Sequence, residues 1–148
     1  MTAIRGAIRR IPVFPVLAIA GASLVIFVVL NPWLILSPTT PTGGDTGAHV
    51  FGPAYLRDVL LPRGRILGWS NAWFAGFPAF YFYFPLPSLV IVALDAAIPY
   101  GVAFKLVTVM GLLALPPSAY FLSRSLRLGP HVSVVASGAA VIFAFYES

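Results

Sequence analysis

A long stretch without any charged residue, residues 11–44, constrains this chain more than any other feature of its sequence. Its core, IPVFPVLAIAGASLVIFVVL, is about long enough to cross the ~30 Å hydrocarbon layer of a bilayer as one helix. Two further stretches, residues 106–123 and 128–146, contain no Asp, Glu, Lys or Arg. A soluble core could not hide this much apolar surface, so we expect a bilayer to surround much of the chain.

Composition narrows the possible functions. Of the 148 residues, 59% are hydrophobic and 9% are charged, whereas soluble domains carry about 25% charged residues. The basic residues form no dense stripe, so we expect no nucleic acid among the partners. The absence of cysteine excludes disulfides, thiolate metal sites and cysteine nucleophiles. The two histidines, His49 and His131, lie too far apart in the sequence to indicate a zinc site.

The uncharged stretches predict an all-α integral membrane protein with about four transmembrane helices. A single membrane domain, residues 1–148, would contain spans at residues 11–34, 80–97, 105–123 and 130–146. Spanning strands are not expected, because these stretches do not alternate polar and apolar residues. A secretory signal peptide also begins with basic residues, but its apolar segment is only about 7–15 residues long. We therefore expect an uncleaved first helix and a cytoplasmic N-terminus, given the arginines that precede it, Arg5, Arg9 and Arg10.

The positive charges leave one conflict in this topology. After four crossings from a cytoplasmic N-terminus, Arg124 and Arg127 lie outside, whereas the positive-inside rule prefers them inside. If residues 80–97 only dipped into the membrane and returned, both arginines would be cytoplasmic. We retain four crossings, because the first apolar run sets the orientation most often.

In this topology residues 35–80 form a large first extracytoplasmic loop. A turn-rich linker, SPTTPTGGD, leads into a predicted amphipathic helix at residues 46–61 that would lie in the membrane interface. Pro53 interrupts the helical pattern, so the helix either begins near Pro53 or kinks there.

Polar residues that could take part in catalysis or metal binding gather at the start of this loop. Asp45 and His49 are four residues apart, so their side chains would meet on a helix. A carboxylate beside a histidine can act as a general base on an acceptor hydroxyl, and the carboxylate can also hold a divalent metal. Alternatively, Asp45 only caps the helix, which would stabilise it by about 1 kcal/mol, and His49 is only an interfacial polar residue.

Basic and aromatic residues further along the loop fit a lipid-linked sugar donor. Three arginines could hold a lipid phosphate: Arg57, Arg63 and Arg65. Alternatively, Arg57 only belongs to a solvated face. The aromatic residues between 67 and 87 fit either an interfacial belt or a stacking surface for a sugar ring or lipid chain. The candidates for stacking are Trp69, Trp73, Phe77, Tyr81 and Tyr83.

The order of these features supports a resemblance to a known family. A basic N-terminus and one helix precede a Gly-Asp-x-x-x-His loop start, which is followed by WSNAWFAGFPAFYFYFPLP and AFKLVTVMGLLALPPSAYFLSRSLRLG. This order resembles the N-terminal part of bacterial membrane proteins of the GT-C glycosyltransferase superfamily. It is most similar to the subgroup labelled 6-pyruvoyl-tetrahydropterin synthase-related membrane protein. The resemblance covers roughly residues 11–145.

The resemblance implies an enzyme of the bacterial plasma membrane that uses a polyprenyl-phosphate sugar in cell-envelope glycan or glycolipid assembly. GT-C enzymes place an acidic residue in the first extracytoplasmic loop, as the base or beside a divalent metal such as Mg²⁺ or Mn²⁺. Only Asp45 falls where that residue is expected. GT-C enzymes also have more crossings than we predict here. We therefore expect this chain to be the N-terminal part of a longer protein, or to act with other membrane subunits.

Two other functions remain open. The chain could be a non-catalytic scaffold or partner subunit of an envelope complex, in which Asp45 only caps a helix. It could also be a segment of a lipid or ion transporter that uses Asp95, because a carboxylate inside a membrane marks an ion path or a pairing partner. Asp95 lies near Pro99 and ten residues before Lys105, however, so a position in a cytoplasmic loop explains it better than an ion path.

Overall fold

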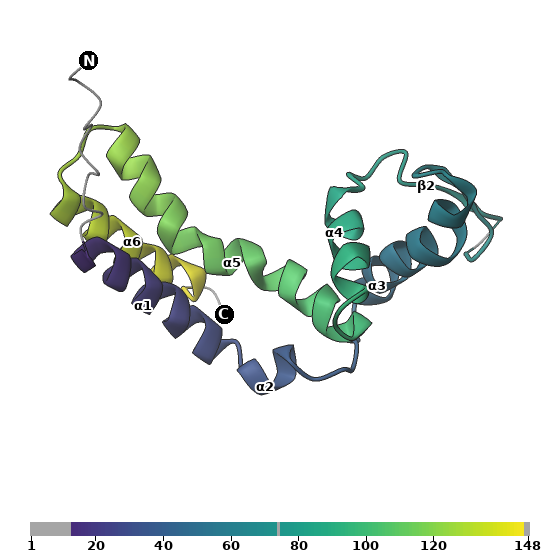
Figure 1. Cartoon of the computed structure of the whole chain (residues 1–148), viewed down its shortest axis with the longest axis horizontal. Coiled ribbons are helices and arrows are strands. Elements are labelled where there is room, and N and C mark those ends of the chain that lie inside the picture. Colours follow the sequence, from purple (N-terminus) through teal and green to yellow (C-terminus); the bar gives the residue numbers. More distant parts are fainter. Residues whose placement is uncertain (1–12, 74, 147–148) are drawn as a thin grey trace, which may run out of the picture. The chain divides into compact units, whose positions relative to one another are not determined.

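The computed structural model describes residues 13–73 and 75–146, and in these residues it is mostly helical (Figure 1). The start of the predicted span 11–34 and the N-terminal arginines lie outside the described residues. The chain divides into two compact units. One unit combines Met1–Leu30 with Gly111–Ser148, and the other is Asn31–Met110. That residues 1–148 form one membrane domain stays a prediction.

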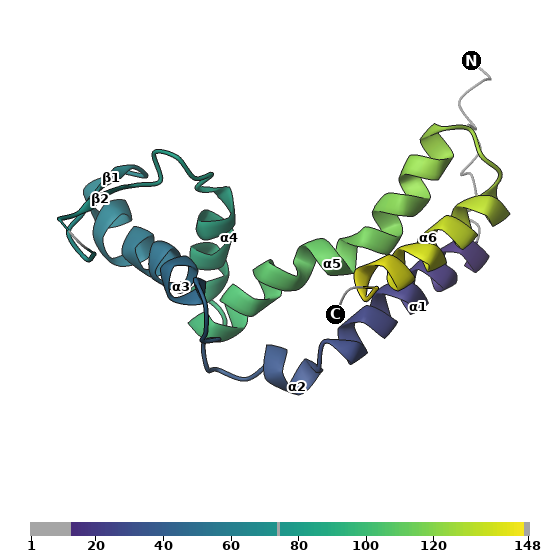
Figure 2. The ribbon, with the colours of Figure 1, turned by 180° about the vertical axis from the view of Figure 1, so that it is seen from behind.

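The described residues of the first unit form three helical segments. Helix α1 (Val13–Val29) lies along α6 (Pro130–Ala144), as Figures 1 and 2 show from opposite sides, and the C-terminal part of α5 (Tyr100–Ser125) completes the unit. The hydroxyl of Ser23 in α1 donates a hydrogen bond to the carbonyl of Leu113 in α5, at 2.9 Å.

This unit exposes many large apolar side chains and buries small ones on α6, although Ile26 of α1 is also fully buried. On α6 the buried residues are small or polar, Ser133, Ser137 and Ala140, whereas Val135 and Phe143 are 70% and 79% exposed. Small residues let helices approach closely where lipid, rather than water, surrounds them. Helix α1 likewise exposes large apolar side chains. An exterior of this kind is typical of a surface that contacts lipid or another protein.

Helix α5 is the one helix in the described part of the chain that is long and apolar enough to cross a membrane. Its 26 residues rise about 39 Å, which exceeds the ~30 Å hydrocarbon layer. Helices α1 and α6, with 17 and 15 residues, are apolar but shorter. The predicted helix at 105–123 is confirmed as a helix, and α6 covers residues 130–144 of the one predicted at 130–146. In the described part of 11–34, α1 ends at Val29, and a short separate helix, α2 (Pro32–Ile35), follows a left-handed Asn31. That α1 and α6 cross a membrane remains a prediction.

The second unit is built on a helical segment that covers residues 46–63. Helix α3 (Thr46–Tyr55) runs into a π-helical turn η1 (Leu56–Leu60) and a 3₁₀ turn η2 (Leu61–Arg63). The predicted helix is thus present, and it begins at Thr46 rather than at Pro53. Its position in a membrane interface stays a prediction. Pro53 lies inside α3, where it cannot donate to the carbonyl of His49. The wider π-helical turn η1 comes directly after α3 in the chain.

A hairpin, helix α4 (Leu86–Asp95) and the first turns of α5 pack around this segment, which is preceded by the short helix α2 (Pro32–Ile35). The hairpin consists of the antiparallel strands β1 (Gly68–Ser70) and β2 (Phe77–Ala79), and it pairs Trp69 with Pro78. Helix α4 and the first turns of α5 follow it in the chain. The core lies where α3, α4 and α5 meet. Its residues are Ile91, Ala103 and Phe104, with Val50, Ile98, Tyr100 and Val107 packed against them.

Two predictions about this unit need correction. The all-α assignment missed the hairpin, whose three-residue strands lie inside the aromatic stretch. The predicted span at residues 80–97 contains only α4, whose ten residues rise about 15 Å, half the thickness of a hydrocarbon layer. A loop precedes α4, so this segment does not form a spanning helix.

Candidate functional site

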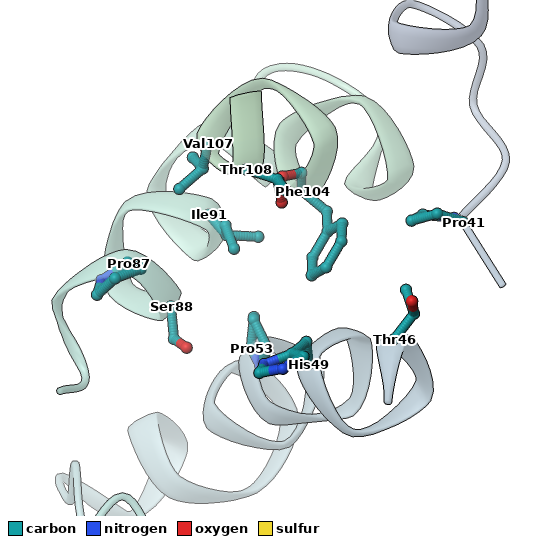
Figure 3. Close-up of a pocket in the computed structure, with 10 residues that line it drawn as sticks. All are labelled: Pro41, Thr46, His49, Pro53, Pro87, Ser88, Ile91, Phe104, Val107 and Thr108. Carbon is teal, nitrogen blue, oxygen red and sulfur yellow. The ribbon is translucent and has the colours of Figure 1, made fainter. Parts of the chain in front are cut away.

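A cavity of about 490 Å³ opens within the second unit, between α3, α4 and the first turns of α5 (Figure 3). Its walls are mainly apolar, and its polar side chains come from each of the three helices. His49 is the only titratable residue that lines it. The lining residues are Pro41, Thr46, His49, Pro53, Pro87, Ser88, Ile91, Phe104, Val107 and Thr108.

Asp45 and His49 are placed by a glycine turn that opens α3. Gly43 and Gly44 have φ values of +107° and +47°, a backbone region that favours glycine. The chain then enters the helix, and the amide of His49 donates to the carbonyl of Asp45 at 3.4 Å. Asp45 occupies the N-cap position, as predicted, but its side chain makes no capping hydrogen bond.

The predicted pairing of Asp45 with His49 is only partly present. The two residues are one helical turn apart, but in the described structure no hydrogen bond or ion pair joins their side chains. Both residues are exposed, and His49 lines the cavity whereas Asp45 does not. No three His, Asp or Glu side chains among the described residues could share a metal ion. Asp45 therefore offers one carboxylate, and a bound Mg²⁺ or Mn²⁺ stays a prediction.

Arg57 forms a network that the sequence did not indicate. Its Nε donates to Oδ1 of Asp58 at 2.6 Å and its Nη2 to Oδ2 at 2.9 Å, while its Nη1 donates to Asp95 in α4. The guanidinium carbon also lies 5.3 Å from the ring centre of Tyr100 in α5. One side chain of η1 thus joins α4 and α5.

The charges of this network support each other. Hydrogen bonds to Asp58 and then to Asp95 raise the pKa of Arg57, so the guanidinium stays charged. The hydrogen bond from Arg57 lowers the pKa of Asp58 below its ordinary value. The side chain of Asp95 is only 13% exposed, which makes a charged partner important. If Asp95 lay inside a membrane, the sequence predicted either an ion path or a pairing partner for it. Asp95 has a pairing partner, which is Arg57.

The three arginines predicted to hold a phosphate differ in availability. Arg57 already uses Nε, Nη1 and Nη2 on two carboxylates, so it would bind a phosphate only by giving up these bonds. Arg63 and Arg65 flank the left-handed Gly64, are exposed and form no ion pair with a described residue. These two are the arginines that a phosphate could reach.

The predicted stacking residues fall into two groups. Trp73 and Phe77 pack against Phe51 of α3, with ring centres 4.6 Å and 6.3 Å from it, and so fasten the hairpin to the helix. The other three have exposed rings: Trp69 on β1, and Tyr81 and Tyr83 in the loop before α4. The residues do not form one stacking platform.

Lys105 is a further polar residue whose role could not be predicted. Its Nζ donates to the carbonyl of Leu34 and, at 2.8 Å, to the carbonyl and the hydroxyl of Ser37. These bonds satisfy carbonyls at the end of α2 and attach the start of the loop to α5. The same contact brings the backbone of Pro38 and Thr39 against Gly101.

Comparison with protein-family models, with curated proteins and with solved structures finds no match to this chain. The resemblance to the GT-C superfamily therefore rests on the sequence features quoted above. The cavity, the position of His49 and the Arg57 network are the structural observations on which a function can be proposed.

Proposed function

We propose that this chain binds a lipid-linked substrate in the cavity between α3, α4 and α5, and that it acts in glycosyl transfer from a polyprenyl-phosphate sugar. The observation that carries the proposal is the placement of His49, which is the only titratable side chain in an otherwise apolar and hydroxyl-lined cavity. Apolar walls with a few polar groups are typical of sites for amphipathic ligands.

In this mechanism His49 is the general base. A neutral imidazole accepts the proton of an acceptor hydroxyl while the hydroxyl oxygen bonds to the anomeric carbon. The bond from that carbon to the phosphate oxygen breaks, and the lipid phosphate leaves with the electron pair. The imidazolium then releases its proton to water. Asp45, one turn away and free of a capping bond, would stabilise the imidazolium by a change of rotamer.

The proposed location is the bacterial plasma membrane, with several crossings and a cytoplasmic N-terminus. The length of α5 and the apolar exterior of α1 and α6 support membrane insertion. The ion pair between Arg57 and Asp95 supports three crossings, by α1, α5 and α6, rather than four, because paired residues lie on one side of a membrane.

A transfer assay tests the proposed activity. Membranes that contain the chain would receive a polyprenyl-phosphate sugar with a radioactive hexose, and transfer to membrane glycans would be measured. We expect His49→Gln to lower the transfer rate by about 10²- to 10⁴-fold, because a general base contributes that much. Asp45→Asn should lower it as well. Asn71→Ala, in the exposed hairpin turn, is the matched control and should leave the rate unchanged.

Two outcomes would count against the enzyme. If His49→Gln transferred sugar at the unsubstituted rate, His49 would not be the base. If the unsubstituted chain at normal abundance supported no transfer, the non-catalytic scaffold would be favoured. Transport has less support, because Asp95, the residue that suggested an ion path, is paired with Arg57.

A further inference from the structure

The loop between β2 and α4, which we call the aromatic loop (residues 80–85), exposes an unusual set of side chains. Four consecutive aromatic residues have large exposed fractions, up to 83% for Phe82 and 90% for Phe84. The other two of the four, Tyr81 and Tyr83, are also exposed. Leu86, the first residue of α4, continues the apolar surface. Figure 1 shows this loop as the open connection from the hairpin to α4.

The exposure is built into the fold and is not the result of a loose loop. At one end, Phe80 has a left-handed backbone with φ +64°, and its ring lies 3.6 Å from the position that a Cβ on Gly52 of α3 would occupy. A strained residue of this kind persists only where its surroundings hold it. At the other end, Pro85 accepts the first hydrogen bond of α4, from Leu89 at 2.9 Å. Both ends of the loop are therefore anchored.

We infer that the aromatic loop inserts its side chains into the boundary between the headgroups and acyl chains of a lipid bilayer. Tyr and Phe in alternation match this boundary, because tyrosine hydroxyls stay in the polar layer while the rings enter the apolar one. No charged residue occurs between Arg65 and Asp95, so no charge in this stretch opposes insertion of the aromatic loop.

The charges next to the aromatic stretch favour lipid over a protein partner. Arg63 and Arg65 are exposed just before the hairpin, in no ion pair with a described residue, and are available to anionic headgroups. Exposed arginines next to exposed aromatic rings are the combination that interfacial anchors use. The inference rests on the membrane part of the proposed function but not on the glycosyl transfer.

Single cysteines test the inference, since the chain has none of its own. Phe84→Cys in the aromatic loop, Asn71→Cys in the hairpin turn and Val28→Cys on α1 would each carry an environment-sensitive fluorophore. The full chain would be placed in vesicles of phosphatidylethanolamine and phosphatidylglycerol. Lipids with a nitroxide on the acyl chain and aqueous iodide would serve as the two quenchers.

We expect nitroxide lipid to quench the probe at residue 84 strongly, and iodide to quench it roughly tenfold less than the probe at residue 71. Equal iodide quenching at 84 and 71 would overturn the inference, because the loop would then face water. Protection of residue 84 from both quenchers would overturn it too, because a protein or a second copy would then cover the loop.

The probe on α1 separates this inference from the proposed function. If residue 28 is quenched by lipid and residue 84 is not, the chain is embedded and only the aromatic loop has been assigned wrongly. If lipid quenches neither residue, the membrane location and the inference both fail. The tested positions are exposed, so the substitutions remove no buried contact.

Discussion

At the scale of single residues, the guanidinium of Arg57 joins three helical segments, and its two carboxylate partners differ in burial. Asp95 is 13% exposed and Asp58 is 56% exposed. We expect Arg57→Ala to lower the free energy of unfolding by about 1–3 kcal/mol, because it leaves the largely buried Asp95 without a partner. Asp58→Ala should cost less than about 1 kcal/mol, since exposed ion pairs contribute little. Thermal unfolding in detergent would measure both.

A double substitution distinguishes the ion pair from a general loss of packing. In Arg57→Ala with Asp95→Ala, no largely buried charge is left unpaired, because the remaining partner, Asp58, is exposed. We therefore expect the loss of stability to be smaller than the sum of the two single losses. If the two losses were additive, Arg57 and Asp95 would not interact in solution, and the argument that both lie on one side of the membrane would lose its basis.

At the scale of elements, two glycines of α5 make a matched pair. A Cβ on Gly101 would lie 2.3 Å from the carbonyl oxygen of Pro38 and 2.6 Å from that of Thr39, whereas a Cβ on Gly111 would meet nothing within 4 Å. We expect Gly101→Ala to destabilise the protein by about 1–3 kcal/mol, because backbone must move. Gly111→Ala should stabilise it by about 0.5–1 kcal/mol, because alanine favours a helix.

Unfolding curves of both variants in the same detergent would check this pair. Equal stability of the two variants would mean that the segment bound by Lys105 does not rest on α5 as described. Digestion by a protease gives a second measurement. We expect cleavage near residues 38–42 to become faster in Gly101→Ala alone, because that segment would then be released.

The sequence predicted those elements that depend on local patterns. Uncharged apolar runs and the turn before Asp45 led to α1, α3, α5 and α6, because helix formation there needs only neighbouring residues. The hairpin was missed, and α4 was predicted as part of a longer spanning helix at residues 80–97. The hairpin depends on the packing of Trp73 and Phe77 against Phe51, residues that are distant in the sequence.

The site was predictable only in part, for the same reason. Asp45 and His49 could be singled out by their types and spacing, but the cavity walls come from α4 and α5, which no local pattern joins to α3. Because the chain has so few charged residues, the pairing of Arg57 with Asp95 could have been inferred from the sequence. The predicted topology hid that pair, because it placed the two residues on opposite sides of the membrane.

At the scale of the whole molecule, these contacts favour three crossings over four in the proposed topology. Arg57 is bound to Asp95, and Lys105 is bound to Leu34 and Ser37. If the protein is inserted in a membrane as proposed, both ends of the segment from residue 34 to residue 105 would therefore lie on one side of that membrane. Helix α5 would then return to the cytoplasm and carry Arg124 and Arg127 with it. This arrangement satisfies the positive-inside rule, which four crossings did not.

Labelling from one side of the membrane tests this topology. Single cysteines at Asn71, Ala96 and Leu126 would be exposed to a membrane-impermeant maleimide on intact cells that produce the full chain. We expect residues 71 and 96 to be labelled, and residue 126 only after the membrane is opened with detergent. Four crossings require the opposite pattern, with 126 labelled and 96 protected. That result would show that the contact of Arg57 with Asp95 does not exist in the membrane.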